Sequence, residues 1–417
     1  MISSPNIAIN NLKNHINTMH SISYMYKIGV GPSSSHTMGP KRAAEKFLAL
    51  HSGVSSYKVT LYGSLAATGK GHMTDKAIID VLSPVAPTEI EWRSDVFLPF
   101  HPNAMTFHAY NANGLEIGSR TYYSVGGGDI LEEGQQVSAR PEVYELSNIT
   151  EIKEWCRNSG RSFWEYVDVH EGNTIWDYLR EVWQVMKEAV QRGIEAEGVL
   201  PGGLGVSRKA VSYYVKALGY TGSLKSRGLV YAYALAVSEE NAGGGKIVTA
   251  PTCGACGVLP AVLYHLHLTK GFSEQRILRA LATAGLFGLV VKTNASVSGA
   301  DVGCQGEVGV ACAMAAAAAN QLFGGTPSQI EYAAEMGLEH HLGLTCDPVC
   351  GLVQIPCIER NAYAAARALD SNLFSTFSDG NHFISFDRVV QVMKQTGHDL
   401  PSLYKETSKG GLATIRR

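Results

Sequence analysis

The sequence has no excess of charge of either sign. Its 417 residues include 35 lysines and arginines and 37 aspartates and glutamates, which leaves a net charge of −2. This balance gives no overall field that would attract nucleic acid or anionic lipid, so a small neutral or zwitterionic ligand fits better. The first twenty residues lack a basic segment followed by an apolar one, and the longest apolar runs are too short to span a bilayer. We therefore expect a cytoplasmic protein with neither a membrane nor a nucleic-acid partner.

Cysteine is almost missing from the N-terminal half, where Cys156 stands alone. The other seven of the eight cysteines all follow residue 250. In a chain without a secretion signal, such a concentration indicates metal or redox chemistry before disulfides.

The N-terminal third combines helix and strand patterns, which predicts an α+β domain over residues 1–150. A helix is expected over 36–52, because serines 33–35 supply N-cap oxygens and Pro40 is tolerated in a first helical turn. The chain is long enough for two or three domains and for a substantial core.

The pattern predicts three more elements in this domain. Alternating residues indicate a strand over 57–63, and a short helix is expected over 74–83 with Thr74 as its cap. Residues 105–125 resemble a hairpin in which Asn113-Gly114 suits a type I′ turn.

Residues 151–417 are predicted to form a second, mainly α-helical domain, so the fold class is α+β. Long helical patterns are separated by glycine-rich joints. Two of them, over 274–291 and 307–323, are apolar almost all round, which is typical of central, buried helices.

The segment "KIGVGPSSSHTMGP" at residues 27–40 has two interpretations. A Gly/Ser-rich loop that leads into a helix presents N–H groups, hydroxyls and the positive end of the helix dipole to one point, where a carboxylate or phosphate binds. The alternative is a serine cap followed by an exposed histidine. A Walker A loop is excluded, because no Lys-Ser/Thr pair follows the last glycine.

The cysteine motifs are ambiguous on their own. Cys253 and Cys256 form a C-x-x-C, which taken alone suggests zinc or a dithiol, but no second C-x-x-C accompanies it. Cys304, Cys346 and Cys357 stand in or beside turns rich in glycine or proline, where thiolates can converge on an iron–sulfur cluster. Buried free cysteines would look the same.

Several motifs together resemble one family, the bacterial iron–sulfur L-serine dehydratases. They are "KIGVGPSSSHTMGP", "GHMTDKAI", "APTCGACGVLPAV", "TNASVSGADVGCQGEVG", "GLTCDPVCGLVQIPCIERNA" and "ETSKGGLA". The resemblance covers nearly the whole chain and implies a β-type domain fused to an α-type domain that carries a 4Fe–4S cluster. It also implies that this enzyme converts L-serine to pyruvate and ammonia.

The resemblance implies three ligands for the cluster, Cys304, Cys346 and Cys357. Three ligands leave one iron open to act as a Lewis acid on a substrate oxygen. Some members of the family end in a cysteine that could cap this iron, whereas the last cysteine here is Cys357. Cys253, Cys256 and Cys350 also lie in the motifs, so one of them is a candidate fourth ligand.

His36 is the predicted base, because a histidine can be neutral at working pH and this one follows the loop expected to hold the carboxylate. Glu307 and Asp347 are alternatives, although a cap or a hydrogen bond to the cluster is the plainer role for each. Eight residues are predicted to contact the substrate: Ser33, Ser34, Ser35, Thr37, Ser64, Asn294, Ser296 and Ser298. The last four suit turn or cap positions equally well. The active site is expected between the two domains.

Other functions stay open at this point. A related lyase such as an L-cysteine desulfidase would use the same iron, and a pyridoxal-phosphate dehydratase would use a lysine such as the one in "AGGGK". An iron–sulfur redox sensor would carry the cluster without turnover. A homodimer is expected, because large apolar helices need cover.

Overall fold

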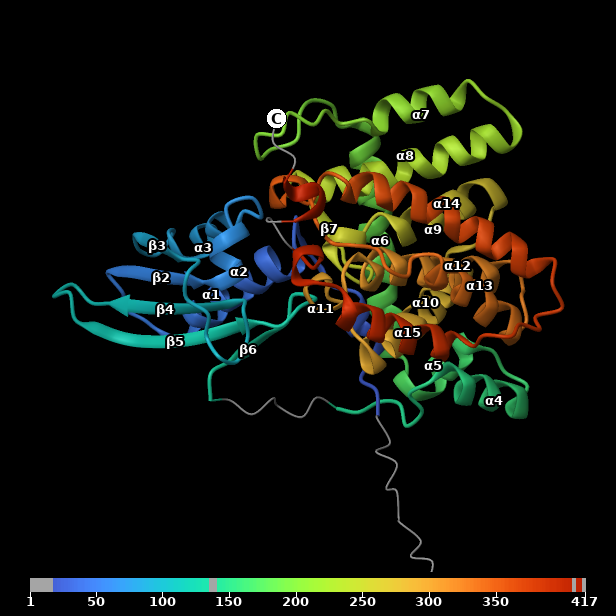
Figure 1. Cartoon of the computed structure of the whole chain (residues 1–417), viewed down its shortest axis with the longest axis horizontal. Coiled ribbons are helices and arrows are strands. Elements are labelled where there is room, and N and C mark those ends of the chain that lie inside the picture. The colour runs from blue at the N-terminus through green and yellow to red at the C-terminus, as the bar shows by residue number, and fades with distance from the viewer. Residues whose placement is uncertain (1–17, 135–140, 407–409, 415–417) are drawn as a thin grey trace, which may run out of the picture.

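A five-stranded sheet forms the smaller of two parts in the computed structural model, which describes residues 18–134, 141–406 and 410–414 (Figure 1). The strand order is β3-β2-β4-β5-β6, with β2 and β3 parallel and the other neighbours antiparallel. The strands are β2 (Ser56–Tyr62), β3 (Thr88–Arg93), β4 (Ala104–Tyr110), β5 (Glu116–Ser124) and β6 (Ile130–Glu132). The first seventeen residues, for which the sequence predicts no leader, lie outside this description.

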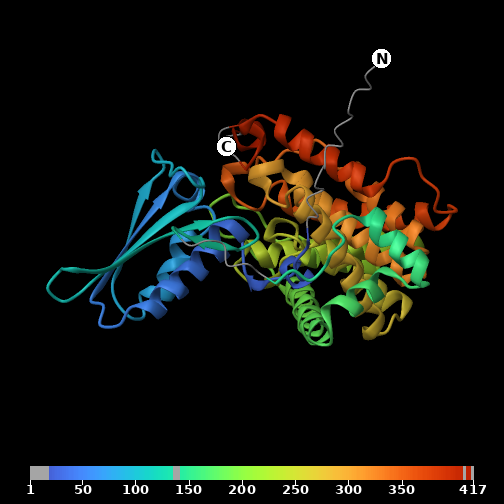
Figure 2. The ribbon, with the colours of Figure 1, turned by 90° about the horizontal axis from the view of Figure 1, so that it is seen from below.

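Helices cover one face of the sheet, and Figure 2 shows the longest of them, α1, running along it. These helices are α1 (Gly39–Leu50), α2 (Gly63–Thr68) and α3 (Thr74–Leu82). Phe47 of α1 packs against Tyr57 and Phe107 of the sheet, with ring centroids 6.2 and 5.3 Å away. These aromatic rings form much of a separate small core.

The helix predicted over 36–52 begins differently from the expectation. Ser33 is the N-cap and accepts a hydrogen bond from the His36 amide, as the sequence suggested, but the first turn (Ser34–Met38) is π-helical. The α-helix α1 follows it, with Pro40 in its first turn. The wider π turn matters for the site, because it carries Ser34 and Ser35 and is capped by Ser33.

Two local predictions in this part were wrong. Thr74 is not a cap: it is the first residue of α3, and its hydroxyl donates to the His36 carbonyl at 2.5 Å. The β4–β5 hairpin is present, but Asn113-Gly114 does not form a type I′ turn. Gly114 alone has a positive φ of 73° in a longer loop, with its amide bonded to the Asn111 carbonyl, the pattern of a type I turn followed by a bulge.

The larger part is helical, as predicted, so the chain has an α+β fold (Figure 1). Its helices are α4 (Ile149–Ser159), α5 (Phe163–Glu171), α6 (Thr174–Glu195), α7 (Ala210–Leu218), α8 (Gly222–Ala242), α9 (Val258–Lys270), α10 (Glu274–Asn294), α11 (Gly299–Val302), α12 (Val308–Leu322), α13 (Pro327–Glu339), α14 (Cys357–Thr376) and α15 (Phe386–Asp399). Short 3-10 turns include η1 (Ile22–Met25), η3 (Cys253–Ala255), η4 (Cys304–Gly306), η5 (Val349–Gly351), η6 (Ser402–Tyr404) and η7 (Gly411–Thr414).

The two helices expected at the centre are indeed buried. Every residue of α12 except Gln321 is buried, and α10 is buried from Leu281 to Val291. By length and composition α10 could cross a membrane, but 78% of its apolar window is covered by the rest of the protein. A core helix of a globular protein gives the same signal.

The start of the described chain belongs with the helical part. Met19, Ile22 and Tyr26 lie in the large helical core, and β1 (Ile28–Val30) pairs antiparallel with β7 (Lys246–Val248). The domain boundary near residue 150 stays a prediction. This short two-stranded ribbon holds the serine turn against the helical part.

Candidate active site

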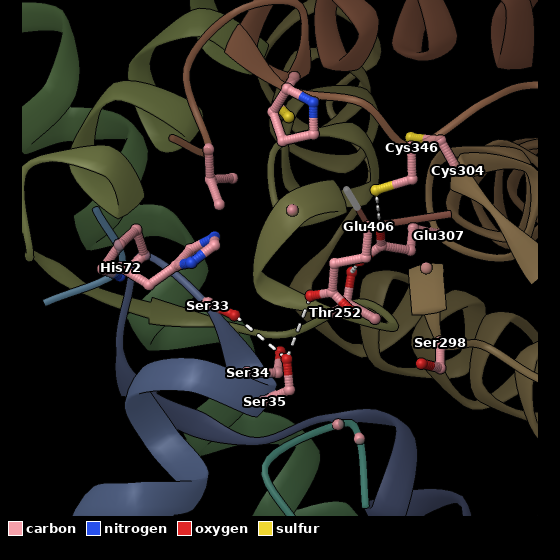
Figure 3. A pocket seen from close by; sticks show the side chains of 18 residues that line it. Ser33, Ser34, Ser35, His72, Thr252, Ser298, Cys304, Glu307, Cys346 and Glu406 are labelled. Carbon is pink, nitrogen blue, oxygen red and sulfur yellow. Dashed lines mark hydrogen bonds between the residues drawn. The ribbon is translucent and has the colours of Figure 1, made fainter. Parts of the chain in front are cut away.

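One pocket lies where the two parts meet, and its walls come from segments far apart in the chain (Figure 3). It contains about 580 Å³ of space between atoms, part of it open to solvent. The sheet part supplies residues 32–35, His72 and glycines 126–127, and the helical part supplies most of the rest. Ligand clefts often form at such junctions.

The serine turn presents hydroxyl groups to this pocket. Ser33, Ser34 and Ser35 all line it, and the Ser33 and Ser35 hydroxyls are 3.3 Å apart. The Ser34 hydroxyl accepts a hydrogen bond from the Cys253 amide at 2.8 Å. A turn with several hydroxyl donors can bind a carboxylate without any lysine or arginine.

A glycine lets this turn lie directly on the helical part. A Cβ atom on Gly31 would stand 1.9 Å from Oδ1 of Asn241, so no larger residue fits there. The Asn241 amide donates to the Pro32 carbonyl at 2.9 Å. The position of the serines is therefore fixed by α8 as well as by their own turn.

Two histidines stand behind and beside the serines, with ring centroids 4.6 Å apart. His36, the predicted base, is fully buried: its Nδ1 lies 2.8 Å from the Ser35 hydroxyl and its Nε2 lies 3.2 Å from the Ser64 hydroxyl. His72 lines the pocket itself, whereas His36 does not. Sequence reasoning missed His72, although it lies in the motif "GHMTDKAI".

The surroundings of His72 determine which of its ring nitrogens carries the proton. Nδ1 lies 3.1 Å from the Thr68 carbonyl, which can only accept, so Nδ1 is protonated and Nε2 has a free lone pair in the neutral ring. Burial lowers the pKa of His72 to about 4 and holds the pKa of His36 well below its usual range. Both rings are thus neutral at physiological pH.

Three of the eight cysteines line the pocket, and they are Cys304, Cys346 and Cys357. Cys304 lies in the η4 turn before α12, Cys346 lies in the loop after α13, and Cys357 is the first residue of α14. The other candidates do not line it: Cys253 and Cys256 are buried nearby, and Cys350 is exposed.

The donor set fits an iron–sulfur cluster. Soft thiolates are the usual ligands of such clusters, and each binds a different iron, so they surround the cluster and do not converge on one point. Across the described ranges no three His, Cys, Asp or Glu side chains gather as they would around a single ion.

An arginine faces these thiols. Burial raises the pKa of Cys304 to about 11, and Glu307 acts in the same direction, whereas the Arg360 guanidinium lowers it. Arg360 is held by the Thr345 carbonyl at 2.6 Å and lies 3.8 Å from Asp347. A fixed positive charge here favours the thiolate forms that bind metal. Arg360 has no local sequence signal that would indicate this role.

Two carboxylates line the pocket, Glu307 and Glu406. Glu307 accepts a hydrogen bond from the Thr252 hydroxyl at 2.8 Å and from the Cys346 thiol at 3.6 Å, and burial raises its pKa. Asp347, the other alternative base, does not line the pocket: it accepts from the Thr345 hydroxyl and the Leu412 amide.

The remaining predicted contacts divide into two groups. Ser298 lines the pocket, and Thr37 and Ser64 support the histidines, since Thr37 donates to the His72 carbonyl at 2.7 Å. Asn294 and Ser296 lie outside its lining. Asn294 donates to the carbonyls of Ser147 and Val290, and Ser296 donates to Asp301.

Comparison with protein families gives two matches. The family model "Serine dehydratase alpha chain" matches residues 79–413, and "Serine dehydratase beta chain" matches residues 21–95. The first alone covers most of the chain.

Curated relatives match over nearly their full length. The chain is 42% identical to an L-serine dehydratase of Streptomyces coelicolor, covering 94% of this chain and 98% of the relative. It is 41% identical to L-serine dehydratase 1 of Escherichia coli, covering 95% and 99%. It is 38% identical to an L-serine dehydratase of Helicobacter pylori, covering 94% and 98%.

Proposed function

Because the chain belongs to the serine dehydratase family, we propose that it is an L-serine dehydratase that releases pyruvate and ammonia and carries a 4Fe–4S cluster on Cys304, Cys346 and Cys357. The observation that carries this proposal is one pocket in which these three cysteines, the serine turn and His72 meet. The turn alone would suit many anions, and the thiols alone would suit many metal sites. Together they suit a small acid that is activated by a metal.

The serine turn binds the substrate carboxylate in this proposal. Hydroxyls of Ser33 and Ser35 and the nearby Ser298 supply donors from both parts of the protein. Binding there would place Cα near the histidine pair, because His72 lines the same pocket.

The α-proton then passes to a neutral histidine. His72 offers a free Nε2 toward the pocket, and the fully buried His36 is the second candidate. When bound, the cluster supplies an iron without a protein ligand that acts as a Lewis acid for the departing hydroxyl. Loss of the proton and the hydroxyl gives aminoacrylate, which tautomerises to an imine and hydrolyses in water to pyruvate and ammonia.

The decisive experiment measures pyruvate and ammonia from L-serine with anaerobically reconstituted protein, with iron and sulfide quantified per chain. We expect turnover that requires about four irons and four sulfides. L-cysteine is run in parallel with sulfide detection. Faster turnover of L-cysteine would favour a desulfidase, and no turnover in cluster-replete protein would favour a sensor.

A Cys346→Ser variant tests the ligand set in the same preparation. It should lose iron and visible absorbance, whereas Cys350→Ser, which changes an exposed thiol, should keep both. A full cluster in Cys346→Ser would remove this residue from the ligands.

The cytoplasm and a homodimer are part of the same proposal. Tyr363, Phe374 and Phe377 along and just after α14 are 73%, 56% and 84% exposed, which supports an interface on that side. Light scattering of the purified protein measures the oligomeric state.

A further inference from the structure

Glu406 is a carboxylate inside the pocket with no role in the chemistry above. Its side chain is 18% exposed, its Oε1 accepts a hydrogen bond from the Ser35 hydroxyl at 3.3 Å, and the same atom lies 3.6 Å from Nδ1 of His36. Figure 3 shows it beside Glu307 and above the serine turn. A buried carboxylate beside the position expected to bind the substrate carboxylate would repel it, so its presence there requires a physical explanation.

Two described segments near the end of the chain, one on each side of Glu406 in the sequence, bind the loop that carries Cys346. The Cys346 amide donates to the Tyr404 carbonyl at 2.8 Å, and the Leu412 amide donates to Asp347 at 2.9 Å. Both hydrogen bonds therefore lead to the loop that contains Cys346, a predicted cluster ligand. Glu406 itself has a φ of 45°, a left-handed conformation that costs a side-chain-bearing residue roughly 1 kcal/mol or more. Such strain persists where the surrounding structure fixes the residue, often at functional sites.

The charges in the pocket match only one half of a zwitterion. Among the described residues that line it are two carboxylates, Glu307 and Glu406, and no lysine or arginine. Burial, with the nearby Glu307 acting in the same direction, raises the pKa of Glu406 to about 8. A bound cation would stabilise the ionised form of Glu406, which burial and Glu307 disfavour. Glu307 accepts from both Thr252 and Cys346, whereas Glu406 accepts from Ser35 alone among the described side chains, so Glu406 has more acceptor capacity for a ligand.

The position of Glu406 agrees with the connectivity of an α-amino acid. The carboxylate and the ammonium are attached to the same carbon, so the acceptor for one must adjoin the donors for the other. Ser35 lies between the two binding positions, because it lines the pocket and its hydroxyl donates its single proton to Glu406. An ammonium group bound to Glu406 would release this proton for the substrate carboxylate.

We propose that Glu406 binds the α-ammonium group of the substrate and thereby selects amino acids over the corresponding hydroxy acids. This inference rests on the proposed function, since it takes L-serine as the substrate. The Glu406 carboxylate replaces the water that solvates the ammonium, and the serine turn does the same for the carboxylate.

The test compares L-serine with 3-hydroxypropionate, which has the same hydroxyl and carboxylate but no amino group. In Glu406→Gln, KM for L-serine should rise at least about 30-fold with a smaller loss of kcat, because one partner of a buried charged pair is removed. The inhibition constant of 3-hydroxypropionate should stay within about twofold of wild type. Glu406→Asp should recover part of the KM.

Iron, sulfide and visible absorbance are measured in every variant, and they should not change. Glu154→Gln, on the exposed side of α4, is the matched control and should keep wild-type kinetics. An unchanged KM, or equal weakening of L-serine and 3-hydroxypropionate, would overturn the ammonium role. If Glu406→Gln does not fold, the same comparison in Glu406→Asp decides. Wild-type protein that makes no pyruvate would instead refute the proposed function, and this inference with it.

Discussion

His36 and His72 lie ring against ring, yet only one of them has a nitrogen directed to the pocket without a hydrogen-bond partner in the described part of the chain. A general base needs a free lone pair within reach of the proton. The two histidines have the same chemistry and similar burial, so their positions relative to the pocket distinguish their roles.

Replacing each histidine by glutamine should separate their roles. We expect His72→Gln to lower kcat about 1,000-fold, within the usual range for loss of a general base, and His36→Gln to lower it about tenfold through loss of support. Pyruvate formation and α-proton exchange with deuterated water measure both steps.

His398→Gln, at the exposed end of α15, serves as the control. Each variant should keep its iron. A larger loss in His36→Gln than in His72→Gln would return the base to the residue that the sequence indicates.

For individual residues, the sequence predicted which residues belong to the pocket better than it predicted what each of them contacts. The three cysteines, the serines and Ser298 all lie in the pocket, because each stands in a motif rich in turn residues. Asn294 carries the same signal, yet it caps the end of α10. Nothing local distinguishes a cap from a ligand contact. Glu406 and Arg360 were missed because their roles depend on neighbours far along the chain.

Glu331 of α13 joins three elements at the far end of the helical part. It is fully buried and contacts Lys153 of α4, the Phe386 amide at the start of α15, and His382 at 3.8 Å. Burial works against its charge, but these partners lower its pKa overall. The hydrogen bond to Glu331 raises the pKa of His382.

This contact makes stability depend on pH. Because the folded pKa of His382 lies above its unfolded value, its contribution is complete below about pH 6.5 and is lost as pH rises through the folded pKa. The Tm difference between wild type and His382→Gln should therefore be larger at pH 6 than at pH 8, by about 1 to 2 °C. Calorimetry at both pH values measures it, with His340→Gln as the control. A difference that grows toward pH 8 would contradict the contact.

Elements were predicted well where a single pattern determines them. The hydrophobic runs of α10 and α12 can only be buried, and the alternation in β2 can only form a strand with one covered face. The hairpin turn was less predictable, because Asn-Gly suits two turn types and strand register decides between them. The π-helical first turn has no distinct sequence signal.

Asp129 joins the two parts of the molecule. Its carboxylate lies 2.6 Å from Lys27, 3.5 Å from Arg42 of α1 and 3.5 Å from Lys292 of α10. Burial lowers the pKa of Lys27 to about 8, and Asp129 opposes this effect. One anion therefore holds three cations from both sides of the junction.

Asp129→Asn should weaken the junction. Removing the anion leaves the buried Lys27 without compensation, which typically costs about 3 to 5 kcal/mol. Urea unfolding followed by tryptophan fluorescence measures the loss, and Asp80→Asn on the exposed side of α3 should show almost none. An equally stable Asp129→Asn protein would mean that other contacts hold the two parts.

The arrangement of the whole chain was the hardest to predict. Composition separates a sheet part from a helical part, but it cannot show that residues 18–30 pack with the helices. Met19 and Ile22 resemble any buried residues, and the β1–β7 pairing joins segments with no shared local signal. Long-range pairing depends on the complete fold.

The contact between Ser35 and Glu406 spans 371 residues. At a synthesis rate of roughly 5 to 20 residues per second, about 20 to 70 seconds separate the translation of these two residues on the ribosome. Through that interval the nascent chain can hold its serine turn, and later its thiols, without a closed site. If the proposed cluster is present, its three cysteines, the last of which is Cys357, are all synthesised before Glu406 can close the pocket.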